Sequence, residues 1–132
     1  MKTSIMKIAA LTVVICLTAA FSVIAKTVDE EAEYNKYLIS KTKDDNLGIR
    51  TSAMQLLGER KCDRAVKSLL WSLRYDKEYS ARITAALALY KIGDTSILPE
   101  LKRRAKNDRN KTVRHVLYGV IKEMETTYLV SK

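Results

Sequence analysis

Few residues of the chain are of the types that carry out acid–base, nucleophilic or metal chemistry. The sequence has one histidine, His115, and two cysteines, Cys16 and Cys62. A metal site needs several His, Cys or carboxylate groups that converge, and a Cys–His nucleophile pair needs adjacent side chains, whereas Cys62 and His115 are far apart along the chain. Glycine-rich phosphate loops and serine-centred elbows are absent from the sequence. We therefore expect no enzymatic activity, metal or cofactor.

Aspartates and arginines are the charged residues that recur at a fixed spacing. Each of three aspartates precedes an arginine by six residues, and the pattern repeats every 32 residues. The set is Asp44, Asp76 and Asp108 with Arg50, Arg82 and Arg114. Charge-assisted hydrogen bonds between such groups can satisfy the amides of a turn and lock adjacent repeated units together. We predict that they form an internal structural ladder, with ligand binding as the alternative.

The apolar residues that must position this ladder repeat with the same period. Shifting Ala85, Leu89 and Leu101 back by 32 positions gives Ala53, Leu57 and Leu69. Such a period is typical of a solenoid, in which each unit buries its apolar face only by stacking on its neighbours. Helical periodicity predicts helices at residues 49–60, 64–75, 79–92, 96–106 and 112–127, after one that begins near Asp29 and ends near residue 43. The pattern predicts an all-α fold of about three stacked antiparallel helix pairs.

Two strings carry a resemblance to a known family. IRTSAMQLLGERKCDRAVKSLL and ARITAALALYKIGDTSILPEL are similar to HEAT repeats, especially to the short HEAT-like units of phycobilisome lyases, over about residues 34–124. The positions that match best are Arg82, Ala85, Ala86, Ile92, Gly93, Asp94, Pro99 and Leu101. The resemblance implies a right-handed α-solenoid that acts as a scaffold, and it implies no reaction. The first string departs from the pattern, with Lys61 and Cys62 at the Gly-Asp positions.

The N-terminus has the layout of a secretory signal peptide. MKTSIMK is basic, an apolar run follows, and Val23 and Ala25 suit cleavage before Lys26. We therefore predict a signal peptide at residues 1–25 and a helical repeat domain at residues 26–132, which would be periplasmic or secreted. An uncleaved leader that anchors the chain in a membrane is the alternative. A lipid on Cys16 is disfavoured because the bulky Ile15 precedes it.

The charge balance favours anionic partners. The full chain has a net charge of +9, and loss of Lys2 and Lys7 with residues 1–25 lowers it to +7. The field of this charge extends about one Debye length, roughly 8–10 Å at physiological salt. An anionic polymer or a membrane surface is therefore one predicted partner. Nucleic acid is disfavoured because the leader takes the chain out of the cytoplasm.

A groove on the second helix of each pair is the other predicted binding surface. In residues 64–75 the apolar stripe takes positions 65, 66, 69, 70 and 73, so Lys67, Trp71 and Tyr75 face away from it. The position that matches Trp71 is Ile39 in the preceding unit and Arg103 in the next. In HEAT-like solenoids these helices line the concave surface. The candidate partner-binding residues are Ile39, Lys67, Trp71, Tyr75, Arg103 and Lys106.

An aromatic side chain with basic neighbours suits a protein segment or an anionic polymer, through burial of an anchor and cation–π contact. The alternative is that Trp71 packs against the next repeat and that the basic residues only solubilise the surface.

Without residues 1–25 the chain has one cysteine, so no internal disulfide can form. Cys62 lies beside Lys61 in a turn, and a dimer linked through Cys62 is an alternative to the monomer that we expect.

Overall fold

The computed structural model describes residues 1–130, apart from the side chains of residues 2–15, 19, 20, 22 and 23. Its backbone is helical, and no strand occurs among residues 1–130. The α-helices are α1 (Lys2–Lys41), α2 (Leu47–Glu59), α3 (Val66–Tyr75), α4 (Tyr79–Ile92), α5 (Leu98–Asn107) and α6 (Lys111–Val130), with 3₁₀ turns η1 (Asp63–Ala65) and η2 (Thr95–Ile97). The predicted all-α fold is confirmed.

The elements follow the 32-residue period of the sequence. Helices α2, α4 and α6 begin at Leu47, Tyr79 and Lys111, which are 32 residues apart. Helices α3 and α5 begin at Val66 and Leu98, again 32 residues apart, and each follows a 3₁₀ turn. The helices therefore start in the same register in successive units.

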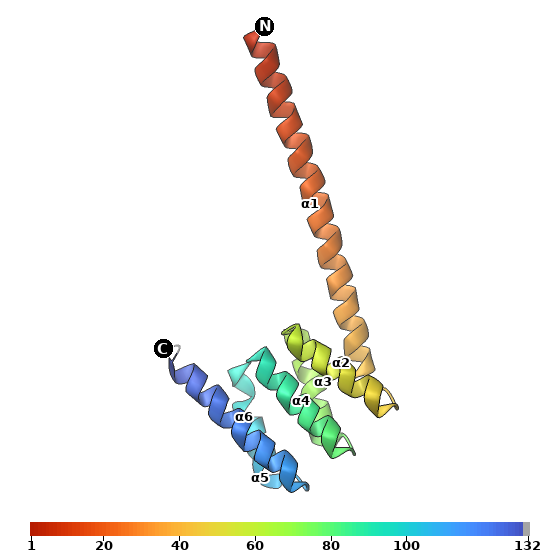
Figure 1. The fold of residues 1–132 in the computed structure, drawn as a ribbon, viewed down its shortest axis with the longest axis vertical. Helices are drawn as coiled ribbons and strands as arrows, with labels where there is room; N and C mark the ends of the chain where they lie inside the picture. The colour runs from red at the N-terminus through yellow and green to blue at the C-terminus, as the bar shows by residue number, and fades with distance from the viewer. Residues whose placement is uncertain (131–132) are drawn as a thin grey trace. The chain divides into compact units, whose positions relative to one another are not determined.

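The helices of the repeat pack in two layers. Helix α4 contacts α2, α3 and α6, and α6 also contacts α5. Figure 1 shows α2, α4 and α6 side by side in one layer, which we call the front layer, with α3 and α5 behind it. Residues 35–132 form one compact unit and residues 1–34 another. The repeat therefore lies within a single compact unit.

Helix α1 is longer than the sequence pattern predicts. A helix start near Asp29 is not observed, because α1 runs without a break from Lys2 to Lys41. The segment between residues 26 and 41 has no glycine or proline to interrupt it, and alanine, glutamate and lysine favour the helix. Most side chains of the predicted signal peptide, residues 1–25, lie outside the described residues, and that interpretation stays a prediction. Among the described residues, none of the helices combines the length and hydropathy that crossing a bilayer requires.

Small residues bring the helices of the front layer close together. Ala81, Ala85 and Ala88 of α4 are buried. A Cβ atom built on Gly58 of α2 would lie 2.7 Å from the Cα atom of Ala88. The two backbones approach so closely that only glycine fits at position 58 without a shift.

The turn between the helices of a unit keeps its shape where the sequence departs from the family pattern. Gly93 ends α4 with φ of 81°, and its 32-residue equivalent Lys61 adopts φ of 48°. Left-handed φ is free for glycine and costs energy for lysine. Pro99 occupies the first turn of α5, as predicted, where its missing N–H removes no helical hydrogen bond.

Candidate functional site: a buried ladder and an exposed groove

Arg82 forms the best buried pair of the predicted ladder. Its Nε and Nη2 atoms donate to Oδ2 and Oδ1 of Asp108 at 2.9 and 3.0 Å. The two side chains are 2% and 0% exposed. The remaining Nη1 atom donates to the backbone carbonyl of Asp76 at 2.8 Å. One guanidinium therefore joins its own turn to the turn of the next unit.

Arg50 makes the equivalent contacts one unit earlier. Its Nε and Nη2 atoms donate to Asp76 at 2.8 and 3.0 Å. Asp76 and Asp108 also accept the backbone N–H groups of Glu78 and Asn110, at 3.0 and 2.9 Å. Each carboxylate therefore holds an arginine from the preceding unit and orders the start of the helix that follows it.

The other two predicted ladder residues lie at its ends. Asp44 accepts a hydrogen bond from Lys41 at 3.1 Å and another from the backbone N–H of Asn46. Arg114 donates to the carbonyl of Asp108 at 2.7 Å, and no carboxylate pairs with it among the described residues. The structure therefore brings together two Arg–Asp pairs, and Asp44 and Arg114 mark where the series begins and ends.

The ladder lowers the pKa of both of its buried carboxyl groups. Burial alone would raise the pKa of Asp108, but hydrogen bonds from Arg82 and the Asn110 N–H outweigh it, and the pKa lies below its ordinary value of 3.8. The same balance, with Arg50 and the Glu78 N–H as partners, lowers the pKa of Asp76. Both groups are therefore ionised at neutral pH.

The predicted groove places an exposed aromatic pair beside basic residues. Trp71 is 43% exposed, and its ring centroid lies 5.6 Å from that of Tyr75 one turn later in α3. Lys43 Nζ lies 4.7 Å from the centre of the Trp71 ring, within cation–π distance. Trp71 thus contacts the segment that follows α1, and its other face remains accessible.

Three of the predicted groove residues line one hollow. Ile39, Lys67 and Trp71 surround a space of about 410 Å³, together with the basic side chains of Lys43 and Arg64. The hydroxyl groups of Thr42 and Ser68 hydrogen-bond to each other across the same junction between α1 and α3. The hollow therefore combines apolar and basic lining residues.

The groove residues on α5 are less closely associated with this hollow. Arg103 is exposed and forms ion pairs with Glu100, which also accepts a hydrogen bond from Arg74 at 2.7 Å. Lys106 is exposed, and no described side chain forms an ion pair with it. The sequence did not reveal the link from Arg74 to Glu100, because it joins positions in different units.

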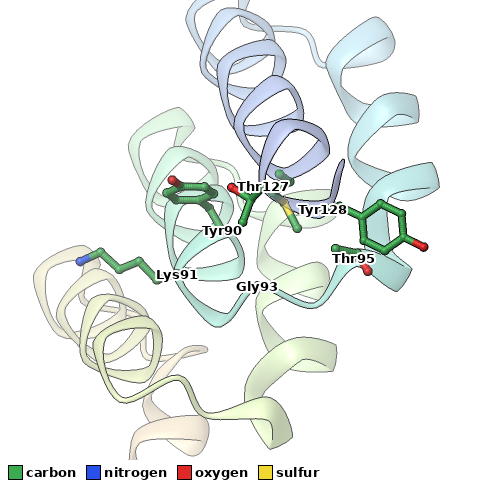
Figure 2. A pocket seen from close by; sticks show the side chains of 7 residues that line it. Tyr90, Lys91, Gly93, Thr95, Thr127 and Tyr128 are labelled. Atoms are coloured by element: carbon green, nitrogen blue, oxygen red, sulfur yellow. The ribbon is translucent and has the colours of Figure 1, made fainter. Parts of the chain in front are cut away.

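The front layer carries a second hollow that the sequence pattern did not indicate. It has a volume of about 370 Å³ and lies between the C-terminal ends of α4 and α6. Figure 2 shows Tyr90 and Lys91 from α4, Thr127 and Tyr128 from α6, and Thr95 from the intervening turn. Lys91 forms an ion pair with Glu59 at 3.5 Å. The lining lacks the paired acid and base that hydrolytic chemistry needs.

The residues that could have carried chemistry are separated. His115 is exposed on α6, whereas Cys62 is buried in the turn before η1. Among the described residues, no group of three or more His, Cys, Asp or Glu side chains could hold a metal ion. Burial of Cys62 argues against a dimer linked through this residue, because its thiol is not presented to a second chain.

The fold and the ladder define a class of protein, the α-helical repeat proteins. Within that class, the family model for HEAT repeats matches residues 35–122 of the chain. The chain belongs to the HEAT-repeat family. The finer resemblance to the units of phycobilisome lyases stays a prediction. A comparison with curated proteins found no match.

Proposed function

We propose that this protein is an exported scaffold that binds a segment of another protein in the groove around Trp71. HEAT repeats generally mediate protein–protein interactions and are generally not enzymes. The observation that carries the proposal is the exposed Trp71–Tyr75 pair beside a hollow of about 410 Å³. Tryptophan and tyrosine are enriched among the residues that dominate binding energy at protein interfaces.

The groove is suited to a chain segment more than to a small metabolite. The Trp71 hollow is open, and a smaller hollow of about 230 Å³, lined also by Asp44 and Asp45, continues from Trp71 past Tyr75 to Lys77. An extended segment could place one apolar side chain against Ile39 and Trp71 while its backbone continues along α3. A rigid helical face of this kind needs little reorganisation on binding, which favours affinity.

Site-specific photo-crosslinking tests the proposal directly. A photoreactive amino acid at position 67 should form a covalent adduct with a partner in cells, whereas the same group at the exposed position 122 on α6 should not form that adduct. Trp71→Ala should abolish the adduct, and Tyr118→Ala, which removes an exposed aromatic ring on α6, should leave it. Equal adducts from positions 67 and 122, or an adduct that survives Trp71→Ala, would dismiss the groove.

Export is a separate part of the proposal. The basic start, the apolar run and the Val23-x-Ala25 sequence support it. N-terminal sequencing of protein purified from its native host should find a chain that begins at Lys26, in an extracytoplasmic fraction. A chain that begins at Met1 in a membrane fraction would favour the uncleaved anchor instead.

The alternative function is binding to an anionic polymer or a membrane surface. The observation that favours it is the net charge of +9, or +7 without residues 1–25. Binding of this kind should weaken steeply between about 50 and 500 mM salt, because small ions screen exposed charges. Sedimentation with vesicles that contain phosphatidylglycerol measures it. A complex with a protein partner that persists at high salt would support the groove rather than this alternative.

A further inference from the structure

Three arginines outside the ladder converge on a small pocket next to the groove. The pocket has a volume of about 200 Å³ and lies at the C-terminal ends of α3 and α5. Arg74, Arg104 and Arg109 line it, with Tyr75 and Asn107 beside them. We call it the arginine pocket. Tyr75 also lines the hollow that contains Trp71, so the arginine pocket and the groove share a wall.

The guanidinium groups of the pocket have donors that the protein does not use. Arg74 donates from Nε to Glu100, and Arg109 donates from Nη2 to the Lys77 carbonyl at 2.6 Å. Arg104 donates from Nη2 to the Arg74 carbonyl and to Asp108, both at 3.2 Å. Each guanidinium has five N–H donors, so each retains several. These groups can donate hydrogen bonds to an additional oxyanion.

One of these unused donors is buried. Arg104 Nε has no hydrogen-bond acceptor among the described residues, although it is shielded from solvent. Buried donors are almost always paired, because leaving one without a partner loses the hydrogen bond that water supplied. Because Arg104 lines the pocket, an oxyanion bound there is a candidate acceptor for this nitrogen.

The charge and size of the arginine pocket indicate which kind of anion it can bind. The carboxylate in the lining, Asp76, is already bonded to Arg50. A volume of about 200 Å³ is below the roughly 300–1,000 Å³ of sites for small organic ligands. The pocket can hold one oxyanion and the short chain that carries it. Guanidinium groups bind the two oxygens of a carboxylate in a matched, bidentate geometry.

We infer that the arginine pocket binds the carboxylate of an aspartate or glutamate on the protein segment that occupies the Trp71 groove. This inference rests on the proposed function, because the shared wall at Tyr75 joins the two sites. It identifies the partner as an acidic segment, with a carboxylate a short distance along the chain from the side chain that packs on Trp71. The positive charge of the protein then contributes a specific contact as well as general attraction.

Titration with two model peptides tests the inference. Trp71 is the single tryptophan of the chain, so its fluorescence reports on the groove without labelling. The probes are hexaglutamate and the neutral hexaglutamine, at fixed ionic strength. Hexaglutamate should change the Trp71 emission and shift the NMR signal of the Arg104 Nε–H group, and hexaglutamine should do neither. Absence of the Arg104 shift at saturation would overturn the inference.

Matched charge variants separate the pocket from general electrostatic attraction. Arg109→Gln removes a pocket donor, whereas Lys122→Gln removes the same charge from an exposed position on α6. Arg109→Gln should weaken hexaglutamate binding about tenfold, the effect of one charge-assisted hydrogen bond. Lys122→Gln should change it less than about twofold. Equal weakening by the two variants would overturn the inference, and circular dichroism checks that both remain folded.

Three further measurements distinguish a carboxylate site from a site for other anions, and distinguish failure of the arginine pocket from failure of the groove. Inorganic phosphate that shifts the Arg104 signal when hexaglutamate does not would show a site for free anions, and would overturn the inference. Phosphatidylglycerol vesicles that bind with the same Arg109 dependence and displace hexaglutamate would point to a membrane and also overturn it. A crosslink from position 67 that Trp71→Ala abolishes but Arg109→Gln leaves unchanged would reject the pocket and retain the groove.

Discussion

The buried arginines show how one side chain can connect two repeats. Arg82 uses all three nitrogens of its guanidinium, with Nε and Nη2 on Asp108 and Nη1 on the Asp76 carbonyl. Removing both charges from water is costly, and the pair is stable only because nearly every donor finds an acceptor. Exposed pairs such as Lys102–Glu125 gain little, because water screens them. We therefore expect substitutions in the ladder to lower the free energy of unfolding more than substitutions in exposed ion pairs do.

The substitution Arg82→Ala tests this expectation. The substitution leaves the Asp108 carboxylate buried without its cation, and breaking a buried pair in this way costs about 3–5 kcal/mol. Urea unfolding monitored by circular dichroism measures the loss. Arg114→Ala is the matched control, because this arginine is only half-buried and its described bond is to the Asp108 carbonyl. The control should lose only about 1 kcal/mol.

A double variant separates the pair from its packing. Arg82→Met with Asp108→Leu replaces both charges by apolar groups of similar volume, and such replacements are often neutral or stabilising. We expect it to recover much of the stability lost in Arg82→Ala. An Arg82→Ala protein that unfolds at the same urea concentration as the wild type would contradict a structural role for the ladder. The crosslink from position 67 in the Trp71 groove, measured below the unfolding transition of Arg82→Ala, should persist, because Arg82 does not line the hollow of about 410 Å³.

The pH dependence of stability follows from the lowered pKa of Asp108. A carboxyl group whose pKa is lower in the folded state stabilises the fold above its unfolded pKa, and this contribution is lost as the pH falls through the folded value. The stability difference between the wild type and Asp108→Asn should therefore be constant at neutral pH and shrink as the pH falls below 3.8. Urea titrations at a series of pH values measure it. A difference that grows below that pH would have the wrong sign.

At the scale of the helices, two glycines in helix interiors provide opposite tests. Gly58 of α2 faces the Ala88 backbone, and an added Cβ would lie 2.7 Å from the Ala88 Cα atom. Gly119 of α6 faces open space, with nothing within 4 Å of an added Cβ. Gly58→Ala should destabilise the protein because α2 must move away from α4. Gly119→Ala should stabilise it by about 0.5–1 kcal/mol through helix propensity.

Thermal unfolding of the two variants measures both effects, and the opposite signs make the comparison internally controlled. A stabilising Gly58→Ala would show that α2 and α4 are separated by more than the structure indicates. A destabilising Gly119→Ala would show that the outer face of α6 is covered in solution.

The helices were largely predictable from the sequence because successive units share one period, although only one unit carries both turn residues of the family pattern. Gly93 and Pro99 mark the turn and the start of the following helix, and the apolar positions keep their 32-residue phase. The beginning of α1 was not predictable in this way. Asp29 is a good helix cap, but a helix that is already under way passes through it when no breaker intervenes.

The candidate site was less predictable, because its contacts join different units. The period pointed to Trp71 and Tyr75 as outward-facing residues, and the structure shows both exposed. The arginine pocket depends on Arg104 reaching the end of α3, about thirty residues earlier in the chain, through the Arg74 carbonyl. No local pattern encodes such a contact. Burial of Cys62 was likewise not indicated by its place in a turn.

At the scale of the whole repeat, the two ends of the stack differ. Ala81 and Ala88 of α4 are buried, with Ala88 packed against α2, whereas their equivalents on α2, Ile49 and Leu56, are 46% and 37% exposed. The outer face of α6 instead carries His115, Gly119 and Lys122, with the exposed ring of Tyr118 among them. Terminal units of a solenoid need a polar outer face for solubility. His115 and Lys122 suit that requirement better than Ile49 and Leu56 of α2 do.

Truncation from each end tests which parts of the chain the fold requires. Residues 35–132 form a compact unit by themselves, so a protein that consists of residues 26–132 should fold and melt in one cooperative transition. Removing α6 as well, to leave residues 26–110, takes Val113, Leu117 and Ile121 out of the core and uncovers the faces of α4 and α5 that pack against them. Stability of a short stack is the sum of its few interfaces, so this loss should abolish the transition. Circular dichroism melting measures both proteins. Cooperative unfolding of residues 26–110 would mean that fewer units suffice, and an unfolded 26–132 chain would mean that the N-terminal part of α1 is required.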